Sequence, residues 1–452
     1  MTTTTIIWFR RDLRLADHPA LIEAVQAAGP AGEVVALFCV DDHLWGPAGA
    51  NRRAFLVGCL RALDESIGGR LVVRWGDPAA VVAAVAAEVG ALEVFITADF
   101  APYGTRRDDG VAAALGDAGR ALVRVGSPYA VAPGSVMNGS GLPYKVFTPF
   151  FKGWMSHGWA ESLPAPGAVQ WSELPSEPWP DATPSAVRMA EPGEAAARAT
   201  AHRFSSEHLA TYDTQRNDPG AAATSGLAPY LKWGCIHPRQ LLEKLGSSRA
   251  EAVFRSELGW REFYADVLHH RPDTVRSAFN PAMAAMEVDT ADTDGLFQAW
   301  CEGRTGFPIV DAGMRQLVAE GFMHNRVRML VASFLVKDLH LDWTRGARFF
   351  MEHLADGDVA SNQHGWQWVA GTGTDASPYF RIFNPVIQGE RFDPGGVYVR
   401  RWVPELAAVE DRYVHHPWDD PAGAPPGYPA PMVDHAEERG EALRRYAAVR
   451  GR

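Results

Sequence analysis

The sequence predicts an α/β domain and an all-helical domain, joined by a long connector. Short apolar runs alternate with amphipathic segments over residues 1–126, whereas helical periodicity dominates from Glu194 onward. Between them Gly and Pro become frequent, and the stretch SLPAPGAVQWSELPSEPWPDATP is typical of a linker. We therefore expect an α/β domain over 1–127, a connector over 128–195 and a helical domain over 196–452.

The first domain is expected to hold a doubly wound parallel sheet. Repeated strand–helix–strand units imply right-handed crossovers and a sheet that is covered on both faces. The expected strands are Thr5–Phe9, Val34–Val40, Leu71–Arg74, Glu93–Thr97 and Ala121–Val125, and the expected helices are Pro19–Ala28, Asn51–Ile67, Pro78–Val89 and Thr105–Ala118. No GxGxxG follows the first strand, so the usual dinucleotide-binding fingerprint is missing from this domain.

The second half of the chain is expected to be helical throughout. Helical periodicity marks the segments Ala195–Gln215, Arg239–Leu245, Glu251–His269, Phe297–Glu302, Val310–Glu320, Asn325–Leu341 and Thr344–Leu354. Within the connector, Tyr144–Trp154 (YKVFTPFFKGW) is too aromatic for a free linker, so we expect it to pack on a domain.

The composition is that of a globular protein of two or three domains, at 452 residues. A net charge of −11 argues against a surface coated with basic residues for general nucleic-acid binding, although a local basic groove is compatible with it. The four cysteines lack a CxxC spacing, so neither a disulfide frame nor a metal site is expected. We see no signal peptide and no long apolar span, and expect a cytoplasmic monomer without a membrane segment or an obligate protein partner.

Two polar constellations in the helical half have the residue types of a ligand site. The hydroxyls and glycine of 224–228 (TSGLA) precede a helix, where they form either an anion site or an ordinary N-cap. Glu257, Trp260, Arg261 and Tyr264 share one helix face at i, i+3, i+4 and i+7. That face is either the wall of a cleft or a surface salt-bridge face.

A third constellation is 323–329 (MHNRVRM). Asn325 and Met329 are four residues apart and should point the same way on a helix, which leaves Arg328 to face other partners. Arg328 could neutralise Asp356 or Asp358 in a buried ion pair near a ligand.

The stretch from Asp356 to Pro385 gathers carboxylates, carboxamides and tryptophans into a few turns of chain. Its two aspartates flank a glycine, which suits a tight turn. Trp366 and Trp368 are two residues apart, so on a helix they point in different directions. Taken alone, the stretch is either a loop held by side-chain hydrogen bonds or a ligand site.

The chain as a whole resembles the photolyase/cryptochrome family, and specifically the microbial class I cyclobutane pyrimidine dimer photolyases of the deazaflavin-antenna type. The motifs that carry the resemblance are WFRRDLRLADHPAL (8–21), TSGLAPYLKWG (224–234), ELGWREFY (257–264), TGFPIVDAGMRQL (305–317), MHNRVRM (323–329), DGDVASNQHGWQW (356–368) and YFRIFNP (379–385). They span nearly the whole chain in the order of the family. The resemblance implies light-dependent repair of cyclobutane pyrimidine dimers in DNA, by electron transfer from reduced FAD to a flipped-out dimer.

The resemblance also implies roles for single residues. FAD would be bound by Tyr212, Thr224, Ser225, Gly226, Leu227, Arg261, Arg328, Asp356, Asp358 and Asn362. The dimer pocket and its catalytic groups would be Glu257, Trp260, Asn325, Met329 and Trp368. Electrons would pass through Trp366 and Trp343, and DNA would be contacted by Trp260, Arg326 and Arg381. No metal is implied.

Two departures from the family pattern bear on these roles. Ala228 replaces the last serine of the TSxLS pattern, which removes one hydroxyl at a cost of about 0.5–1.5 kcal/mol. The third tryptophan of the electron-transfer chain should lie about ten residues before Trp300, where this chain has Thr290, with Val288 nearby. We expect that photoreduction is slow or uses another terminal donor.

The antenna chromophore implied by the resemblance is a deazaflavin rather than a folate. Folate-binding members carry an Asn-Glu pair after the fourth strand, whereas residues 99–104 here read DFAPYG. The residues expected near the deazaflavin are Cys39, Asp41, Arg52, Asp99 and Lys232. An empty pocket or a flavin within it is the alternative.

Two other functions compete with repair. One is a cryptochrome-like blue-light photoreceptor that signals through protein partners, although the sequence stops shortly after its last motif, without the long tail that many such receptors carry. The other is an α/β nucleotide-binding protein with a helical appendage. A colourless preparation of the purified protein would favour this class.

Overall fold

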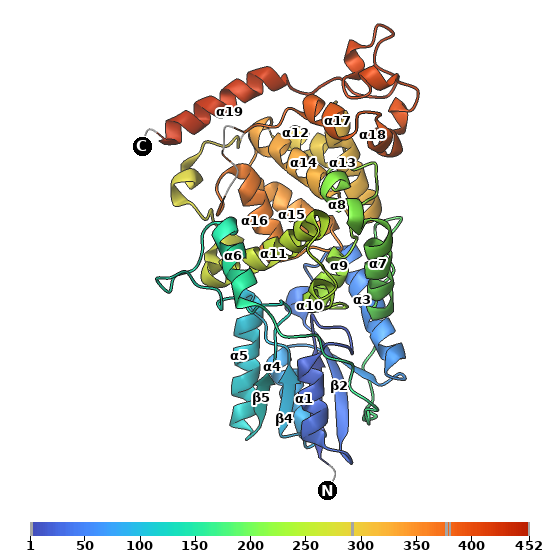
Figure 1. Cartoon of the computed structure of the whole chain (residues 1–452), viewed down its shortest axis with the longest axis vertical. Coiled ribbons are helices and arrows are strands. Elements are labelled where there is room, and N and C mark those ends of the chain that lie inside the picture. Colours follow the sequence, from blue (N-terminus) through green and yellow to red (C-terminus); the bar gives the residue numbers. More distant parts are fainter. Residues whose placement is uncertain (1–2, 291–292, 376–377, 379–380, 451–452) are drawn as a thin grey trace. The chain divides into compact units, whose positions relative to one another are not determined.

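The computed structural model describes residues 3–290, 293–375, 378 and 381–450 of the chain, which form two compact units (Figure 1). Unit 1 consists of Met1–Pro184, Ala190–Glu207 and Ser225–Pro272. Unit 2 consists of Ser185–Met189, His208–Thr224 and Asp273–Arg452. The first part of the helical half therefore packs with the sheet, and the domain boundaries expected at 127 and 195 stay a prediction.

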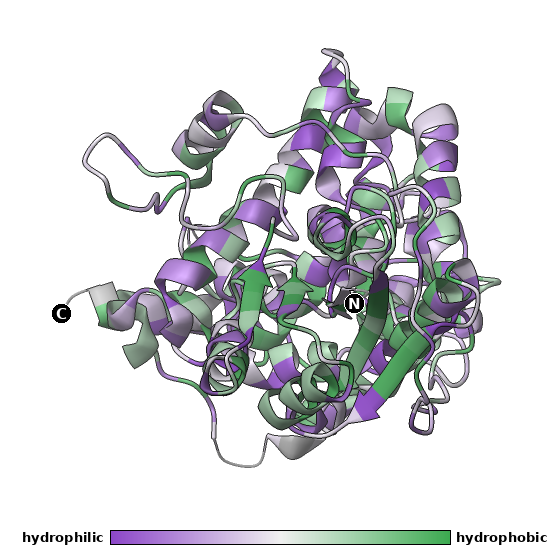
Figure 2. Cartoon of the chain, turned by 90° about the horizontal axis from the view of Figure 1, so that it is seen from below, coloured by the Kyte–Doolittle hydropathy of each residue, from purple (hydrophilic) through white to green (hydrophobic). Residues whose placement is uncertain are grey.

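Unit 1 is built on a five-stranded parallel sheet in the order β3-β2-β1-β4-β5. The strands are β1 (Thr4–Phe9), β2 (Glu33–Val40), β3 (Leu71–Trp75), β4 (Glu93–Ile96) and β5 (Ala121–Arg124). The central strands are continuous apolar runs because helices cover both of their faces, and Figure 2 shows them mainly in the colour of hydrophobic residues. All five expected strands are confirmed to within one residue at each end.

The helices of unit 1 comprise those between the strands and five that follow them. They are α1 (Pro19–Ala28), α2 (Asp42–Trp45), α3 (Ala50–Ser66), α4 (Pro78–Glu88), α5 (Pro102–Asp117), α6 (Phe147–His157), α7 (Glu194–Glu207), α9 (Ala228–Trp233), α10 (Pro238–Leu242) and α11 (Arg249–His270). The expected helix from Ala195 to Gln215 is interrupted, since α7 ends at Glu207. The aromatic segment of the connector forms α6 and packs on α11, as its composition predicts.

Unit 2 is helical throughout its described residues. Its helices are η1 (Leu209–Thr211), α8 (Tyr212–Gln215), η3 (Pro281–Ala285), α12 (Asp294–Cys301), α13 (Pro308–Glu320), α14 (Asn325–Lys337), α15 (Trp343–His353), α16 (Val359–Ala370), α17 (Pro385–Phe392), α18 (Val397–Trp402), η4 (Pro404–Leu406), η5 (Asp411–Tyr413), η6 (Pro417–Asp419) and α19 (His435–Arg450), and η2 (Pro272–Val275) starts at the boundary with unit 1.

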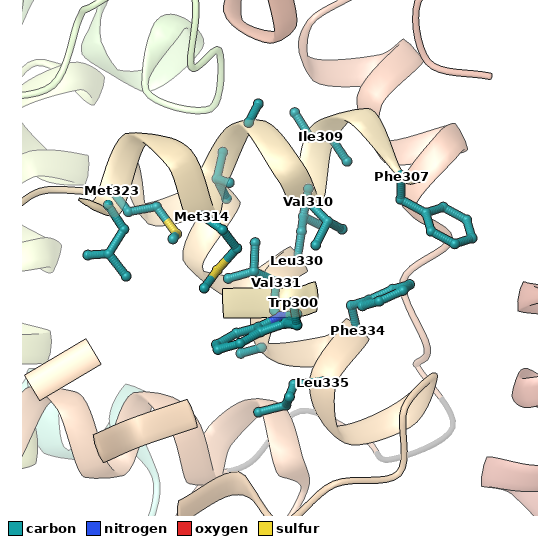
Figure 3. Packing of buried hydrophobic residues seen from close by; sticks show 14 of the residues in the cluster. Trp300, Phe307, Ile309, Val310, Met314, Met323, Leu330, Val331, Phe334 and Leu335 are labelled. Atoms are coloured by element: carbon teal, nitrogen blue, oxygen red, sulfur yellow. The ribbon is translucent and has the colours of Figure 1, made fainter. Parts of the chain in front are cut away.

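The core of unit 2 is assembled mainly from α12 to α16. Trp300 is fully buried and lies among Met314 and Val331, with Phe334 and Leu335 beside them (Figure 3). The indole N–H of Trp300 donates to the carbonyl of Val331 at 3.1 Å, which satisfies its polar atom within the core. Across the described part of the chain, no helix has both the length and the apolar character needed to cross a membrane.

Candidate active site

Helix α11 of unit 1 carries the predicted polar face. A capping box fixes its start, because the Ser248 hydroxyl accepts from the backbone of Glu251 and the Glu251 carboxylate accepts from that of Ser248. Glu257, Trp260 and Arg261 each lie half-buried along the helix, as does Tyr264. These side chains are partly buried, so they do not form a fully solvated salt-bridge face, and their role as the wall of a cleft stays a prediction.

Arg261 is fixed by the backbone of neighbouring segments of unit 1. Its guanidinium donates to the carbonyl of Leu231 at 3.0 Å and to that of Pro128 at 3.3 Å. It also lies over the ring of Tyr129, with Cζ 4.5 Å from the ring centroid. Its position is therefore set by the fold.

Trp260 stacks on an aromatic ring of the connector. The ring centroids of Trp260 and Phe147 are 3.8 Å apart and the rings are 9° from parallel. The two helices approach closely because Gly259 has no side chain: a Cβ atom there would be 2.6 Å from Cδ2 of Phe151.

Another face of α11 binds the connector through buried carboxylates. Glu262 accepts from the backbone N–H of Ala130 at 2.5 Å, from that of Val131 at 3.1 Å and from Nε1 of Trp154 at 2.5 Å. Burial raises the pKa of Glu262 to about 6, although these three donors lower it. Asp266, one turn further on, accepts from the backbone of Gly134 at 2.7 Å.

The segment 224–228 leads into helix α9 without a side-chain cap. Gly226 has a φ of +65°, and Leu227 at the N-cap position makes no side-chain hydrogen bond to the helix. The Ser225 hydroxyl accepts from the backbone of Leu227 at 3.4 Å. Within unit 2, Tyr212 is buried at the start of α8, and the guanidinium of Arg216 lies 5.4 Å from its ring centroid.

In unit 2, Arg328 pairs with Asp356, one of the two partners that the sequence suggested. Nη2 of Arg328 lies 2.9 Å from Oδ2 of Asp356, and Nε donates to the carbonyl of Met323 at 2.8 Å. The side chain of Asp356 is 5% exposed, and its Oδ1 is a buried atom without a hydrogen-bond partner among the described residues. A buried carboxylate oxygen without a donor is energetically costly, which makes Oδ1 a candidate acceptor for a ligand.

Asp358 and Asn362 are placed by the first turn of α16. Asp358 is the N-cap residue, and its carboxylate accepts from the backbone of Ser361 at 3.2 Å. Asn362 lies one turn later, where its amide donates to the carbonyl of Ala347 at 3.0 Å. The glycine between the two aspartates thus belongs to the turn that starts a helix.

The two tryptophans of α16 have different surroundings, as their offset predicts. Trp366 is 3% exposed, and its ring meets those of Trp300 and Phe350 at centroid distances of 6.2 and 5.0 Å. Gly346 provides the space for it, because a Cβ there would be 2.1 Å from Cη2 of Trp366. Trp368 is only half-buried against the same core, and so is Trp343 at the start of α15.

The segment where the motifs predict a third tryptophan holds an ion pair with the C-terminal helix. Thr290 is exposed and Val288 is 39% exposed. Between them, Asp289 pairs with Arg445 of α19 at 2.7 Å, and its N–H donates to the carbonyl of His340 at 3.0 Å. Neither the charged pair nor its neighbours has a redox-active side chain.

The residues of the 323–329 motif differ in how they are held. Asn325 is exposed and Met329 is half-buried on α14. Arg326 donates to Oδ1 of Asn217 at 2.7 Å, and its guanidinium lies 4.6 Å from the ring centroid of Phe392.

Arg381 is exposed, and its backbone is held in place by a buried lysine. Lys337 is 1% exposed, and its ammonium donates to the carbonyl of Arg381 at 3.1 Å. Tyr379 and Phe380 of the same motif lie outside the described residues.

Of the five predicted antenna residues, Asp41 and Asp99 follow the carboxyl ends of β2 and β4, whereas Cys39 lies within β2 and the other two lie on helices. Parallel sheets bind ligands at the carboxyl ends of their strands, where the strand order reverses. Asp41, directly after β2, caps α2 and accepts a hydrogen bond from the Tyr103 hydroxyl. The ring of Tyr103 stacks on His43 at 4.5 Å. Burial and the neighbouring Asp41 raise the pKa of the Cys39 thiol to about 12, so Cys39 stays a thiol.

Asp99, after β4, is held by the start of α5. Its carboxylate occupies the space that a Cβ of Gly104 would fill, at 2.1 Å, and it lies 3.3 Å from Nη2 of Arg107. Burial would raise the pKa of Asp99, but Arg11, Arg107 and Arg10 outweigh it and lower the pKa. Arg52 is buried on α3, and burial lowers the pKa of its guanidinium. Lys232 is half-buried, with its ammonium 5.3 Å from the ring centroid of Trp233.

Comparison with known proteins decides the family. Residues 5–167 match the DNA photolyase family, and residues 254–448 match the FAD binding domain of DNA photolyase. A deoxyribodipyrimidine photo-lyase of Streptomyces griseus is 43% identical over 97% of this chain and 98% of its own. The chain belongs to the DNA photolyase family.

Solved structures of photolyase relatives agree in fold. A bacterial class III photolyase from Agrobacterium tumefaciens has a TM-score of 0.93 at 37% identity, covering 100% of this chain and 98% of that one. A cryptochrome from Synechocystis has a TM-score of 0.88 at 27% identity, covering 98% and 99%. The expected combination of a parallel sheet and a helical FAD-binding domain is confirmed.

The photolyase residues predicted from the motifs are divided between the two units. Unit 1 holds Ser225, Gly226, Leu227, Glu257, Trp260, Arg261 and the five antenna residues. Unit 2 holds Tyr212, Thr224, Asn325, Arg326, Arg328, Met329, Trp343, Asp356, Asp358, Asn362, Trp366, Trp368 and Arg381. Direct contact is seen for Arg328 with Asp356, and for Arg326 with Met329, whose Sδ lies 3.9 Å from Nη1. No cluster of three or more metal-ligating side chains occurs among the residues that the structure describes.

Two groups of side chains were not predicted from the sequence. Phe147 was recognised only as part of an aromatic segment, because no local pattern shows which ring it meets. Arg10 and Arg107 both lie against Trp8, at 4.6 and 5.2 Å from its ring centroid, and both contact Asp108. The arginine-rich start of the WFRRD motif was the available signal for this second group.

Proposed function

We propose that the protein is a light-dependent lyase that splits cyclobutane pyrimidine dimers in DNA. The observation that carries the proposal is similarity over nearly the whole chain to a deoxyribodipyrimidine photo-lyase. The motif residues Glu257, Trp260, Asn325, Met329 and Trp368, which we assign to the dimer pocket, agree with it. The alternative is a photoreceptor, and the likeness to a cryptochrome structure, at lower identity, is what favours it.

The residues present fit FAD. Two groups are suited to the polar edge of an isoalloxazine: the buried oxygen of Asp356 that has no partner, and the guanidinium of Arg328 that pairs with the other oxygen. Asn362 lies six residues after Asp356, in the first turns of α16. The residues proposed to bind FAD are Tyr212, Thr224, Ser225, Gly226, Leu227, Arg261, Arg328, Asp356, Asp358 and Asn362. When bound and reduced, FAD supplies an electron to the dimer after it absorbs blue light. Ala228 leaves one hydrogen bond fewer in the 224–228 segment, which is a loss of about 0.5–1.5 kcal/mol.

The pocket residues have distinct roles toward the flipped-out dimer. Glu257 would hydrogen-bond a pyrimidine edge and stabilise charge that develops there. Trp260 and Trp368, both half-buried, offer flat apolar surfaces on which bases stack. Met329 is a soft filler against the rings, and Asn325 is a hydrogen-bonding partner.

Electron supply is assigned to another pair of indoles. Trp366 is buried in the core of unit 2, whereas Trp343 is more exposed, so the pair runs from the interior outward. The ion pair of Asp289 with Arg445 provides no third relay. Repair starts from reduced FAD, so this shortened relay affects photoreduction and leaves dimer splitting intact.

The finer class and the antenna rest on the motifs. We propose a class I photolyase with a deazaflavin near Cys39, Asp41, Arg52, Asp99 and Lys232. Because the chain is also similar to a class III photolyase structure, the identity of the antenna chromophore is the feature that tests the class I assignment. Extraction of the chromophores and their absorption spectra separate a deazaflavin from a folate, a second flavin or an empty pocket.

Binding in the dark followed by illumination tests the proposed function. A lyase should bind dimer-containing DNA more tightly than undamaged DNA in the dark and lose that preference after blue light, because the repaired bases no longer fill the pocket. We expect Glu257→Ala to weaken the dark preference. A protein that binds both DNAs equally, before and after light, is a photoreceptor or a nucleotide-binding protein instead.

A further inference from the structure

The connector contributes an aromatic wall to helix α11. Phe150 meets Phe263 at a centroid distance of 5.1 Å, and Phe147 meets Phe263 at 5.9 Å. The rings of Phe147 and Trp260 lie closer still, with centroids 3.8 Å apart and planes 9° from parallel. It joins residues 113 positions apart, so it exists only through the packing of α6 on α11.

The connector is fastened on both sides of this contact. Before α6, the backbone of Ala130 and Val131 is bound by Glu262, two residues after Trp260 on the same helix. Within α6, the indole of Trp154 donates to the same carboxylate at 2.5 Å. Phe147 is itself 8% exposed. Its ring is therefore a fixed support, with little freedom to move away from Trp260.

The stacking leaves the indole of Trp260 with two unlike faces. Phe147 covers one face almost in parallel, whereas Phe263 and Tyr264 meet the indole at 73° and 47°. Trp260 nevertheless stays half-buried, so part of its surface is accessible. An aromatic ring can stack on Trp260 only from the face that Phe147 does not cover.

We propose that Phe147 is a positioning residue for the substrate: it holds the indole of Trp260 in the orientation on which one base of the pyrimidine dimer stacks. This inference rests on the proposed function, which assigns Trp260 to the dimer pocket. It adds a determinant of dimer affinity that lies in the connector. Phe147 falls within the family match at residues 5–167, away from the match at residues 254–448, and is not one of the proposed antenna residues.

The test is the dark affinity of the FAD-loaded protein for a dimer-containing oligonucleotide. Phe147→Ala removes the support, and we expect binding to weaken by roughly 3- to 10-fold, the equivalent of one aromatic pair. Single-turnover repair at saturating DNA should be unchanged, because electron supply does not involve Phe147. Phe147→Tyr keeps a flat ring and should bind the dimer as tightly as the wild type does. Phe147→Leu should bind it as weakly as Phe147→Ala does.

Two controls separate the ways in which the idea can fail. Phe150→Leu removes a neighbouring ring that meets Phe263 and Tyr144. It therefore causes a loss of aromatic packing comparable to that of the Phe147 variants, but should leave the affinity for the dimer unchanged. Trp260→Ala tests the proposed function itself. If Trp260→Ala weakens dimer binding and Phe147→Ala does not, the positioning role is wrong. If Phe147→Leu binds as tightly as wild type, apolar bulk suffices and stacking is not needed. If Trp260→Ala has no effect, the pocket assignment fails first.

Discussion

The guanidinium of Arg328 lies 2.9 Å from one carboxylate oxygen of Asp356, and the other oxygen of Asp356 is buried without a partner among the described residues. A carboxylate in this state is half satisfied by the protein. The remaining acceptor explains why we assign Asp356 to the flavin edge.

Asp356→Asn should lower FAD affinity by about 10- to 100-fold, since a hydrogen bond to a charged group contributes about 1.5–3 kcal/mol. The variant keeps an oxygen for Arg328, so the melting temperature of the FAD-free protein should change little. Flavin absorbance per protein after gel filtration measures the effect. Asp342→Asn is the matched control, because Asp342 caps α15 through Thr344 and takes no part in the site. Equal FAD content in all three proteins would contradict the assignment.

Trp366→Phe should slow photoreduction of the oxidised protein by at least about tenfold and spare repair that starts from chemically reduced protein. The reason is that Trp366 is buried beside Trp300 and Phe350, away from any role in base stacking. Trp368→Ala should instead weaken dimer binding. Flash absorption and dark DNA titration separate the two effects, with Trp402→Phe as a control for packing. Loss of the same step in both variants would show that the division of roles is wrong.

Thr290→Trp should raise the yield of photoreduction, because it places an indole where the family has its third tryptophan and this chain has an exposed threonine. Thr290→Phe, which adds a ring of much lower redox activity, should not. Transient absorption after a flash is the measurement. A long-lived, exposed tryptophan radical at normal yield in the wild-type protein would instead reveal another terminal donor.

Glu262 should make the protein less stable as the pH rises from about 4.5 to 7. Its pKa in the folded protein is raised to about 6 by burial, so the folded state binds this proton more tightly than the unfolded state does. The contribution is fully present below the unfolded pKa and is lost through pH 6, with a total of about 2 kcal/mol. In denaturant titrations, the free energy of unfolding of Glu262→Gln should therefore rise relative to that of the wild type by this amount as the pH increases over this range. A difference that stays constant with pH would mean that Glu262 remains ionised throughout.

Arg381→Ala should weaken binding to damaged and undamaged DNA alike and reduce the slope of log K against log salt by about 1. Arg381 is exposed while its backbone is anchored by Lys337, which suits a phosphate contact. Arg381→Lys should keep the slope. Arg326 is the proposed second contact, but it also holds Asn217 and Phe392, so its removal should cost stability as well. Selective loss of dimer binding in Arg381→Ala would place Arg381 in the pocket instead.

The central strands were predictable because they are continuous apolar runs whose ends are set by charged or turn residues. Thr4–Phe9 and Glu33–Val40 are examples, since burial on both faces leaves a signal in every residue. Helix α5 starts three residues before its predicted beginning at Thr105, because Pro102 suits a first turn that periodicity alone does not reveal. The long helix predicted over 195–215 is interrupted by a 3-10 turn at Leu209–Thr211, which helical periodicity alone does not reveal either.

The site was predictable only where the chemistry of one side chain calls for a partner of a particular kind. The pairing of Arg328 with Asp356 was among the stated possibilities, because a buried carboxylate needs a cation. The stacking of Phe147 on Trp260 and the pairing of Asp289 with Arg445 were not foreseen. Each joins distant segments through tertiary packing, for which one sequence holds no pattern.

Light-dependent repair by the reduced, purified protein is the most direct test of the account. Dimer-containing oligonucleotide is illuminated with blue light in the presence of the protein, and the remaining dimers are counted by chromatography against a dark control. We expect restored pyrimidines only after illumination, although the protein already binds the damaged DNA in the dark. Intact dimers after illumination of a protein that carries reduced FAD would contradict the proposed function.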